Sequence, residues 1–245
     1  MKKTITALLG FLLPSFLATP FLRLLGHQIG SNVRIGYSWL SLDMLDLGNG
    51  AQIGHFNLII NNSLRLQDNA KIGYLNILKG PFGVKMKKQA AIGNKNYFTR
   101  GPKGLSFGES ELSLGEWTKI TVGHHLDLTQ SISFGNYSIL AGLGSQLWTH
   151  GYYHADKGLD RIRVDGNIMV GDNVYVGSSV IFNPGVTIGS SIHIGSGAVI
   201  SKDLKDPGMY VNQSLRYIEN NLEKVKSRLT PVDGVELVEE VYRKK

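Results

Sequence analysis

Apolar residues recur at every sixth position over a long part of this chain. Starting at residue 170, the steps are Val170, Val176, Phe182, Ile188, Ile194 and Ile200. A second apolar side chain follows four residues after each of the first five steps, at Val174, Val180, Val186, Ile192 and Ala198. This period is neither the 2 of a half-buried strand nor the 3.6 of a helix. A fixed short period indicates a repeat architecture.

The same period appears earlier in the chain. One run consists of Val122, Leu128, Phe134 and Leu140, with Leu126 and Ile132 four residues after its first two steps. An earlier run consists of Ile29, Ile35, Leu47, Ile53 and Ile59, and only Ser41 breaks its frame. Residues 66–115 repeat less regularly. The repeat therefore covers most of the chain from about residue 27 to residue 204.

Six residues suffice for one short strand and one tight turn. Three such units close a triangular coil of about eighteen residues, and successive coils stack at roughly 4.8 Å, the spacing of paired strands. The apolar steps then point inward. Because one coil cannot bury its apolar face alone, such an array is stable only as a stack. The sequence therefore predicts an all-β solenoid.

The segment from residue 170, "VGDNVYVGSSVIFNPGVTIGSSIHIGSGAVISKDL", resembles the hexapeptide-repeat acyltransferases. The resemblance is most specific over 164–204, good over 116–163 and looser over 26–115. Within this family, the bacterial polysaccharide and sugar O-acetyltransferases are the most similar group. The resemblance implies a left-handed parallel β-helix, an exception to the usual right-handed crossover. It also implies a homotrimer.

Three parts are expected along the chain. Residues 1–26 form an apolar N-terminal helical segment. Residues 27–204 form the left-handed parallel β-helix, with loop insertions near 79–104 and 144–163. Residues 205–245 form a C-terminal helical tail, in which 213–229 have the pattern of an amphipathic helix.

The apolar N-terminal segment admits several interpretations. Its basic start, apolar run and small residues are typical of a secretory signal. Pro14, Pro20 and Arg23 interrupt it too often for a comfortable membrane-spanning helix. It also fits an interfacial helix with Lys2, Lys3 and Arg23 among lipid headgroups, which predicts a peripheral membrane contact. A helix packed on the end of the domain is the fourth interpretation. Because acetyl-CoA is a cytosolic donor, the resemblance favours a cytoplasmic protein, working at the inner face of the membrane if the segment binds lipid.

The stretch "GSQLWTHGYYH", residues 144–154, breaks the six-residue frame. Solenoids place functional sites on loops that leave the wall, because such loops do not disturb the core. The stretch contains two histidines, and imidazole suits general base catalysis because its pKa lies near neutrality. "QLWTHGY" is similar to a loop motif of the family. The resemblance implies that His150 removes the proton of a sugar hydroxyl as that oxygen attacks a thioester.

Other residues are candidates for supporting roles at this site. Asp127 lies 23 residues before His150, little more than one coil, and is a candidate to orient the imidazole. Trp148 and Tyr152, with Tyr153, are candidates to stack on a sugar, and His154 is a candidate substrate contact. Each also has a simpler interpretation, as loop packing or a solvated turn residue.

The resemblance also implies a site for acetyl-CoA. Ser178 and Ser196 are eighteen residues apart and so are expected at the same corner of neighbouring coils, where small side chains admit the pantetheine arm. Ser201 and Lys202, in "AVISKDL", match the family's ending, and Lys202 is a candidate phosphate contact. The following segment, "GMYVNQSLRYIEN", departs from the family's pattern.

Composition and charge indicate which classes of partner to expect. The chain has 26 basic and 19 acidic residues, a formal charge of +7, and no cysteine. Residues 69–108 hold eight basic residues and no acidic one. This excess favours anionic partners. Because no nucleic-acid-binding motif accompanies it, nucleic acid is not predicted as a partner.

The sequence thus predicts an acetyl-CoA-dependent O-acetyltransferase that acts on a sugar hydroxyl, free or in a lipid-linked glycan, during synthesis of a bacterial surface polysaccharide. The resemblance implies that no metal is required. Two alternatives stay open. One is a zinc enzyme similar to the γ-class carbonic anhydrases, with ligands from "HGYYH" and from His124 and His125. The other is a solenoid scaffold without catalysis.

Overall fold

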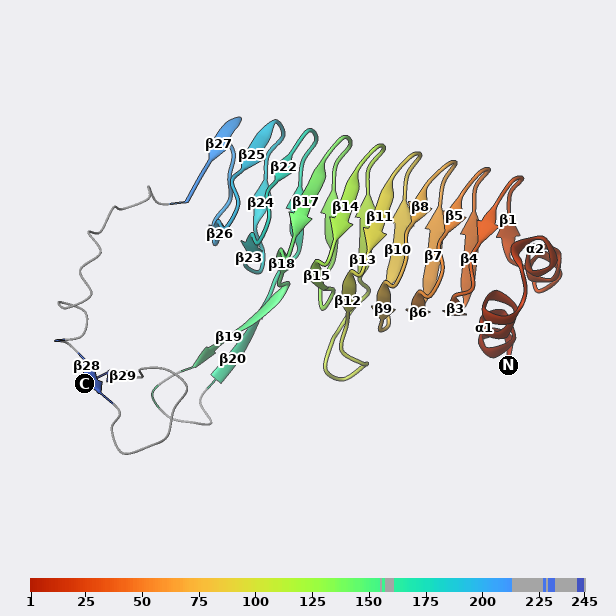
Figure 1. The fold of residues 1–245 in the computed structure, drawn as a ribbon, viewed down its shortest axis with the longest axis horizontal. Coiled ribbons are helices and arrows are strands. Elements are labelled where there is room, and N and C mark those ends of the chain that lie inside the picture. Colours follow the sequence, from red (N-terminus) through yellow and green to blue (C-terminus); the bar gives the residue numbers. More distant parts are fainter. Residues whose placement is uncertain (155, 157–160, 213–226, 228, 232–241, 245) are drawn as a thin grey trace. The chain divides into compact units, whose positions relative to one another are not determined.

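Residues 28–210 wind as a coil of short strands in a computed structural model of the chain (Figure 1). The structure describes residues 1–154, 156, 161–212, 227, 229–231 and 242–244. The chain divides into two units, Met1–Asn212 and Gln213–Lys245. In the second unit, β28 (Leu229–Pro231) pairs antiparallel with β29 (Tyr242–Lys244).

Three parallel sheets form the walls of the coil. Sheet A contains β1 (Gln28–Ile29), β4 (Met44–Leu47), β7 (Ser63–Leu66), β10 (Gly83–Met86), β13 (Glu111–Leu114), β16 (Ile132–Phe134), β21 (Ile168–Val170) and β24 (Thr187–Ile188). Sheet B contains β2 (Arg34–Ile35), β5 (Gln52–Ile53), β8 (Lys71–Ile72), β11 (Ala91–Asn94), β14 (Lys119–Val122), β17 (Ile139–Leu143), β22 (Tyr175–Val176), β25 (Ile192–Ile194) and β27 (Gly208–Tyr210). Sheet C contains β3 (Trp39–Ser41), β6 (Leu58–Ile60), β9 (Ile77–Lys79), β12 (Tyr97–Thr99), β15 (His125–Asp127), β18 (Gln146–Leu147), β23 (Ile181–Phe182) and β26 (Val199–Ile200).

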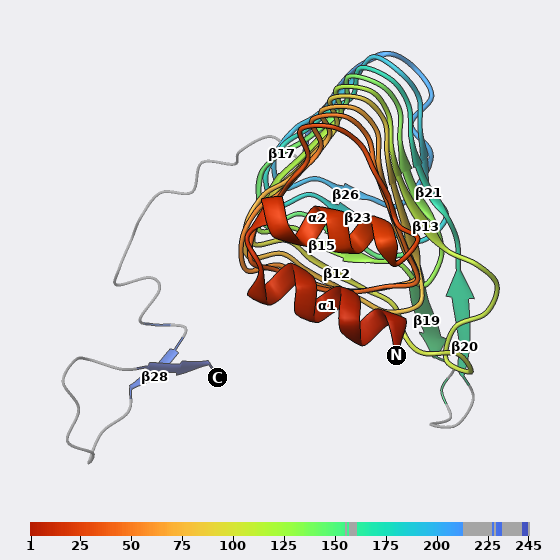
Figure 2. The same ribbon diagram turned by 90° about the vertical axis from the view of Figure 1, so that its right-hand side faces the viewer.

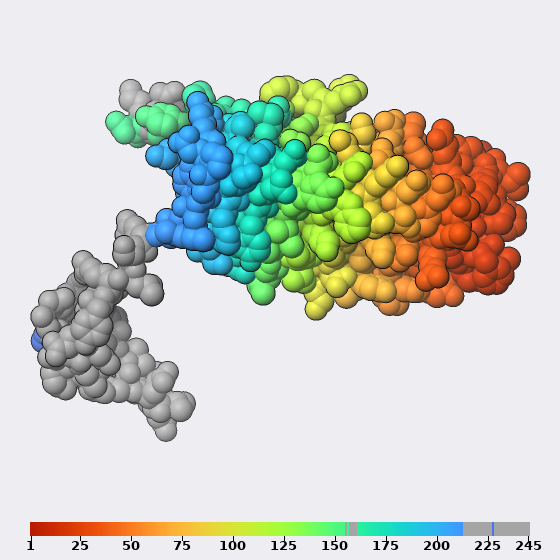
Figure 3. All heavy atoms as spheres, turned by 90° about the horizontal axis from the view of Figure 1, so that it is seen from above, coloured from red at the N-terminus to blue at the C-terminus, as the bar shows by residue number. Residues whose placement is uncertain are grey.

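The coil is left-handed. Seen from the N-terminal end of the stack, the chain passes from sheet A on the right over the top to sheet B on the left, and then to sheet C below (Figure 2). It recedes from the viewer as it makes this counter-clockwise turn. In the space-filling view, the colours follow one another in sequence order along the stack, so each coil occupies its own slice of it (Figure 3). The predicted fold class is confirmed for the solenoid.

Coil length varies along the stack. Met169 pairs with Thr187, eighteen positions later, as the regular repeat predicts. Ser63 pairs with Gly83, twenty positions later. These longer coils explain why the six-residue period is less regular between residues 66 and 115.

The core is the stacked column of apolar side chains between the three sheets. The steps from Val170 to Ile200 are all buried, and so are the second apolar positions from Val174 to Ala198. Val122 is an exception, because its side chain is exposed and Ile120 takes the inward position. Val122 ends its strand at the position that Asn94 occupies in β11, and that residue is exposed as well.

A column of polar side chains is buried at the corner between sheets B and C, the B–C corner. The side-chain oxygen of Asn57 accepts the backbone N–H and the side-chain amide of Asn76, both at 2.9 Å. Asn76 accepts the same pair of bonds from Asn96, whose oxygen accepts the N–H of His124 at 3.0 Å. His124 Nδ1 in turn accepts the N–H of Ser145. Burial is tolerated because these polar groups satisfy one another.

Two helices cover the first coil. Helix α1 (Lys2–Leu12) and helix α2 (Ser15–Leu24) run side by side across the N-terminal end of the stack (Figure 2). Ala18 and Leu22 of α2 pack into the core. Thr6 Oγ1 lies 2.8 Å from Nε2 of the buried His27. Within the described residues, no helix is both long enough and apolar enough to cross a membrane.

The expected loop insertions need correction. Residues 79–104 were predicted as an insertion, yet β10, β11 and β12 of the three walls lie within this range, with Phe82, Val84 and Met86 buried. Its lysines occupy turns and outward positions of twenty-residue coils, which conceals the repeat. The actual interruption lies between β12 and β13, at residues 100–110. It leaves the stack at the corner between sheets C and A, the C–A corner.

The other predicted boundaries also move. Of the predicted insertion 144–163, β18 belongs to the wall of sheet C, and the excursion begins after it. The solenoid does not end at residue 204, since β27 pairs with β25. The predicted helix over 213–229 falls outside the described residues, apart from Ser227, described as a turn, and Leu229, which belongs to β28.

Candidate functional site

The six-residue rhythm breaks at residue 150 because the chain leaves the wall there as a hairpin. Strand β19 (His150–His154) pairs antiparallel with β20 (Arg161–Asp165), and His150 lies opposite Asp165. The alternation in "RIRVD" is typical of a strand with two different faces. The hairpin starts at the C–A corner, directly after β18 and Thr149. His150 is therefore anchored at the wall while the rest of β19 extends from it.

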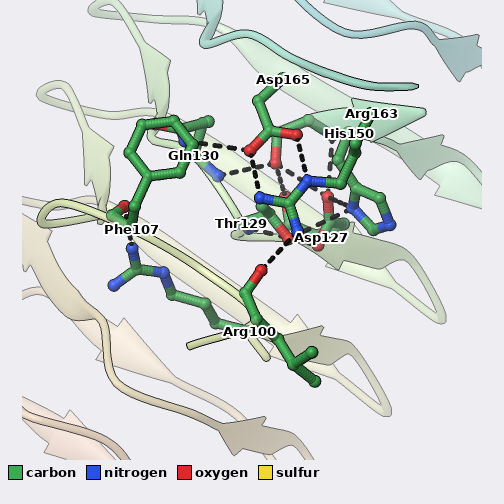
Figure 4. A network of polar contacts seen from close by, with 10 residues as sticks. Arg100, Phe107, Asp127, Thr129, Gln130, His150, Arg163 and Asp165 are labelled. Carbon is green, nitrogen blue, oxygen red and sulfur yellow. Dashed lines mark hydrogen bonds and ion pairs between the residues drawn. The ribbon is translucent and has the colours of Figure 1, made fainter. Parts of the chain in front are cut away.

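His150 and Asp127 form a hydrogen-bonded pair (Figure 4). His150 Nδ1 lies 2.8 Å from Asp127 Oδ2. The carboxylate side chain is buried, at 6% exposed, while the imidazole is 30% exposed. A carboxylate only accepts hydrogen bonds, so the neutral imidazole carries its proton on Nδ1. Nε2 is then left with a free lone pair, as a proton acceptor requires.

Two threonines hold the carboxylate in place. Thr129 bonds Asp127 Oδ1 through its hydroxyl at 2.8 Å and its backbone N–H at 3.2 Å. Thr149 bonds Oδ2 through its hydroxyl at 2.8 Å and its N–H at 3.0 Å. Burial alone would raise the pKa of Asp127, but the bonds from His150, Thr129 and Thr149 outweigh it and lower that pKa. Asp127 is therefore a fixed negative charge behind the imidazole.

Aromatic rings form a ladder along the outer face of sheet C and onto the hairpin. The ring of His125 lies 5.0 Å from Tyr97 and 4.8 Å from Trp148. Trp148 lies 6.5 Å from His150, which lies 6.2 Å from Tyr152. Trp148 Nε1 also donates to Gln146 Oε1 at 3.0 Å. Exposed rings in such a row offer flat apolar surface on either side of His150, the kind that binds a sugar ring.

His154 stands farther out on the hairpin. Its ring lies 6.2 Å from that of Tyr152, and its side chain is exposed. Tyr153 is exposed as well. The structure thus places Trp148 and Tyr152 beside His150 and carries His154 away from it.

A second polar group, which the sequence did not reveal, braces the hairpin. Arg163 donates to both carboxylate oxygens of Asp165, at 2.7 and 2.9 Å, and Gln130 Nε2 donates to Asp165 Oδ2 at 3.3 Å. Bonding to Asp165 raises the pKa of Arg163. Arg163 also donates to the carbonyl of Leu105, in the excursion at 100–110.

The two excursions from the C–A corner therefore meet. Arg100 fixes the base of the first excursion by donating to the carbonyls of Pro81, Phe107 and Gly108 (Figure 4). Phe107, Tyr152, Arg163 and Asp165 line an open hollow of about 390 Å³. Spacing in sequence does not connect residue 105 with residue 163, so only the fold reveals this hollow.

The small residues proposed for the donor lie at the B–C corner. Ser178 and Ser196 stack on neighbouring coils as expected, since Ser196 Oγ accepts the N–H of Ser178 at 3.1 Å. Below them, a Cβ on Gly142 would lie 1.8 Å from Ser178 Oγ, so that position is closed to any larger residue. Gly142 also has φ +64°, which favours glycine.

Ser201 and Lys202 lie at the C–A corner, two coils beyond His150 along sheet C. With Tyr210 and Asn212 they line a pocket of about 210 Å³. Within one chain, the predicted donor residues are therefore divided between two corners, and only Ser201 and Lys202 share the corner of His150.

The histidines that the zinc alternative requires are not brought together. His124 faces inward, and both of its ring nitrogens are within hydrogen-bond distance of protein groups, Thr121 Oγ1 and the N–H of Ser145. Burial lowers the pKa of His124 to about 4. His125 faces outward. Across the described part of the chain, no three His, Asp or Glu side chains are grouped so that they could hold a metal ion.

With the fold and the site described, the chain is defined as a left-handed β-helix with a histidine–aspartate pair at one corner. A scan against protein-family models and a search of curated proteins each found no match to its sequence.

Several solved structures are similar in fold. The polysialic acid O-acetyltransferase OatWY is 15% identical with a TM-score of 0.46, over 82% of this chain and 96% of that one. The polysialic acid-specific acetyltransferase NeuO is 19% identical with a TM-score of 0.37, over 72% and 87%. The N-acyltransferase AntD from Bacillus cereus, with dTDP and 3-hydroxybutyryl-CoA, is 16% identical with a TM-score of 0.35, over 88% and 94%. At this level the likeness concerns the coil.

Proposed function

We propose that this protein transfers an acetyl group from acetyl-CoA to a sugar hydroxyl during the synthesis of a bacterial surface polysaccharide. One observation carries the proposal: a partly exposed imidazole is oriented by a buried carboxylate that five hydrogen-bond donors surround. Such a pair suits the removal of a proton from a bound hydroxyl. The activities named for OatWY and NeuO belong to the same chemical class.

In the proposed reaction, Nε2 of His150 takes the proton of the acceptor hydroxyl. The oxygen then forms a bond to the thioester carbonyl carbon, and the carbon–sulfur bond breaks. The thiolate of CoA leaves and receives a proton from the imidazolium. Asp127 keeps the lone pair of Nε2 directed outward and stabilises the positive charge that develops on the ring. No covalent intermediate with the protein is needed.

Trp148 and Tyr152 are proposed to hold the acceptor sugar, because their rings flank His150. The column of Ser178 and Ser196 is proposed to hold the pantetheine arm, and Lys202 a phosphate of CoA. Since these residues lie at two corners of one chain, the proposal includes a homotrimer in which neighbouring copies complete each site. His154, farther out on the hairpin, is proposed to contact only an extended acceptor.

The test is acetyl transfer from acetyl-CoA to a panel of bacterial polysaccharides, measured both as free thiol released and as acetyl gained by the glycan. His150→Ala is expected to lower kcat by about 10² to 10⁴, the usual contribution of a general base. Acetyl-CoA binding, measured by titration calorimetry, is expected to remain. The matched control is His55→Ala, at a histidine between β5 and β6 that the proposed reaction does not use, and it should leave kcat within a few-fold of wild type.

Transfer that persists in His150→Ala at the wild-type rate would refute the assigned base. Absence of acetyl-CoA binding in the wild-type protein would refute the transferase proposal and favour the scaffold. If zinc were bound stoichiometrically and lost in His150→Ala, the zinc alternative would replace it.

A further inference from the structure

The outer surface of the N-terminal helices is apolar although nothing in the first unit covers it. Its exposed large apolar side chains are Ile5, Leu8, Phe11, Leu12, Phe16, Leu17, Phe21 and Leu24. Leu24 is 83% exposed and Phe16 is 73% exposed. We call these eight residues the end patch. Contiguous apolar surface of this kind marks an interaction site on a soluble domain.

The charges beside the end patch are mainly positive, and the acidic group recorded there, Asp43, is already paired with Lys3. Residues 1–42 contain four basic residues and no acidic one. Lys2 and Arg23 form no ion pair with a carboxylate among the described residues, whereas Lys3 pairs with Asp43 at 2.9 Å. Arg23 is held by the carbonyls of Ile29 and Gly30, at the edge of the first coil. A surface that is apolar in the middle and cationic at its rim complements an anionic lipid surface.

A second copy of the chain fits this surface less well. Two copies joined through the same patch would bring Lys2 and Arg23 of each close to those of the other, and Asp43 is already paired with Lys3. Anionic headgroups supply the missing negative charge.

We infer that the end patch lies in the interface of an anionic membrane and that the β-helix stands upright on it. Both helices lie across the end of the stack and not along its axis (Figure 2). When they lie flat in the membrane plane, the axis of the stack points away from the surface. Because the other end of the stack is made of strands, only one end of the described coil is suited to this contact.

The upright orientation sets the height of the candidate site. Five pairings along sheet C separate β3, in the first coil, from β18, next to His150. At roughly 4.8 Å for each pairing, His150 stands about 24 Å farther from the membrane than the first coil. If the proposed acetyl transfer is correct, the acceptor residue is thus a sugar held some way out from its lipid anchor. The membrane contact itself does not depend on that activity.

The first test is co-sedimentation of the full chain with lipid vesicles. Binding is expected to vesicles of equimolar phosphatidylcholine and phosphatidylglycerol, and to be much weaker to phosphatidylcholine alone. The double substitution Phe16→Ser and Leu24→Ser is expected to weaken binding about hundredfold, since each side chain contributes about tenfold or more when buried. Both side chains point outward, so the fold should survive, and a circular dichroism melt checks this.

The matched control is Met169→Ser with Met209→Ser, two exposed apolar residues on strands of the wall. These substitutions should leave vesicle binding unchanged. Lys2→Glu should reduce the preference for phosphatidylglycerol without removing apolar area. The inference is overturned if the wild-type chain ignores both vesicles, or if Phe16→Ser with Leu24→Ser binds like wild type. It is also overturned if that variant instead abolishes a dimer seen by sedimentation velocity.

The second test measures orientation. The chain has no cysteine, so single-cysteine variants accept one fluorophore each. Met44→Cys in β4 and Met169→Cys in β21 lie on the same sheet, five pairings apart. Energy transfer to acceptor-labelled lipid should be high from residue 44 and low from residue 169, which lies about 24 Å farther out. Equal transfer from the two positions would show that the stack lies flat and would overturn the upright orientation. Vesicle binding uses no glycan or acetyl-CoA, so its outcome is independent of the proposed acetyl transfer.

Discussion

Replacing Asp127 by asparagine tests whether the buried carboxylate stabilises both the fold and the imidazole. Asparagine has nearly the same shape but puts an NH₂ group where one oxygen was. If the NH₂ group takes the place of Oδ2, it lies against three donors, which are the N–H and the hydroxyl of Thr149 and the Nδ1–H of His150. If it faces Oδ1's position, it meets Thr129, whose hydroxyl can rotate while its N–H cannot. The second orientation leaves fewer donors unpaired and should be preferred.

The magnitude follows from those contacts. One buried N–H is left without a partner, which costs about 1–3 kcal/mol, and the remaining bonds lose the benefit of a charged acceptor. Asp127→Asn should therefore lower the free energy of unfolding by about 2–4 kcal/mol at neutral pH. Asp43→Asn, which removes only a surface ion pair with Lys3, should change it by less than about 1 kcal/mol.

The lowered pKa of Asp127 determines how the stability difference between wild type and Asp127→Asn changes with pH. The folded state lowers the pKa of Asp127, so the ionised carboxylate contributes stability that is fully present above its unfolded pKa. This contribution disappears as the pH falls through the lower folded pKa. The stability difference between wild type and Asp127→Asn should thus be constant above about pH 5 and shrink below about pH 4.

Denaturant unfolding followed by circular dichroism measures this difference in stability. The pH is varied from about 3 to about 8, a range that includes the pKa of a carboxyl group in the unfolded chain. Equal stability of wild type and Asp127→Asn at neutral pH would refute the account of the carboxylate. A difference that grows on acidification would contradict the direction of the pKa shift. In the transfer assay, a loss of kcat with unchanged acetyl-CoA binding would place the effect on the imidazole.

Two further predictions concern the wall and the hairpin. Gly142→Ala should lower the midpoint of thermal unfolding and weaken acetyl-CoA binding, because the added Cβ would collide with Ser178 at the B–C corner and an alanine would be strained at a positive φ. A thermal melt measures the first effect and titration calorimetry the second. An unchanged melting temperature would contradict the close packing at this corner. Arg163→Gln should raise KM for the glycan more than it lowers kcat, because the substitution breaks the bonds to Leu105 and Asp165 without changing a contact of His150. Steady-state kinetics measures KM and kcat separately. A fall in kcat with an unchanged KM would contradict a positioning role for Arg163.

Much of the fold was predictable because the six-residue repeat indicates which side chains point inward and which point outward. The apolar steps from Val170 to Ile200 are buried as the period required. The prediction was wrong at 79–104, where coils of twenty residues carry lysines outward and place Phe82 and Val84 inward out of frame. It was also wrong for Val122, because the inward position of this strand is Ile120 and Val122 ends the strand facing outward.

The candidate site was predictable only where the coil length connects distant residues. Asp127 and His150 are 23 positions apart, and the structure pairs His125 with Gln146, so one coil brings the two side chains together. No such spacing relates Arg163 to Leu105, because both belong to excursions whose paths the repeat does not determine. The alternation in "RIRVD" indicates a strand, but not the loop that it contacts.

The column of buried amides at the B–C corner has a consequence for how this coil can vary. Each member of the Asn57, Asn76 and Asn96 series supplies the acceptor for the next, and the six bonds of the series link seven coils, ending at the backbone of Val180. The one extra residue at this corner is absorbed where β14 and β17 shift register, and the series continues past it. Both excursions instead leave from the C–A corner, where no such column runs. One edge of the prism thus conserves its alignment while another is free to acquire new loops. Loops that change the binding surface can therefore be inserted at the C–A corner, next to His150, without disrupting the stacked coils that support the site.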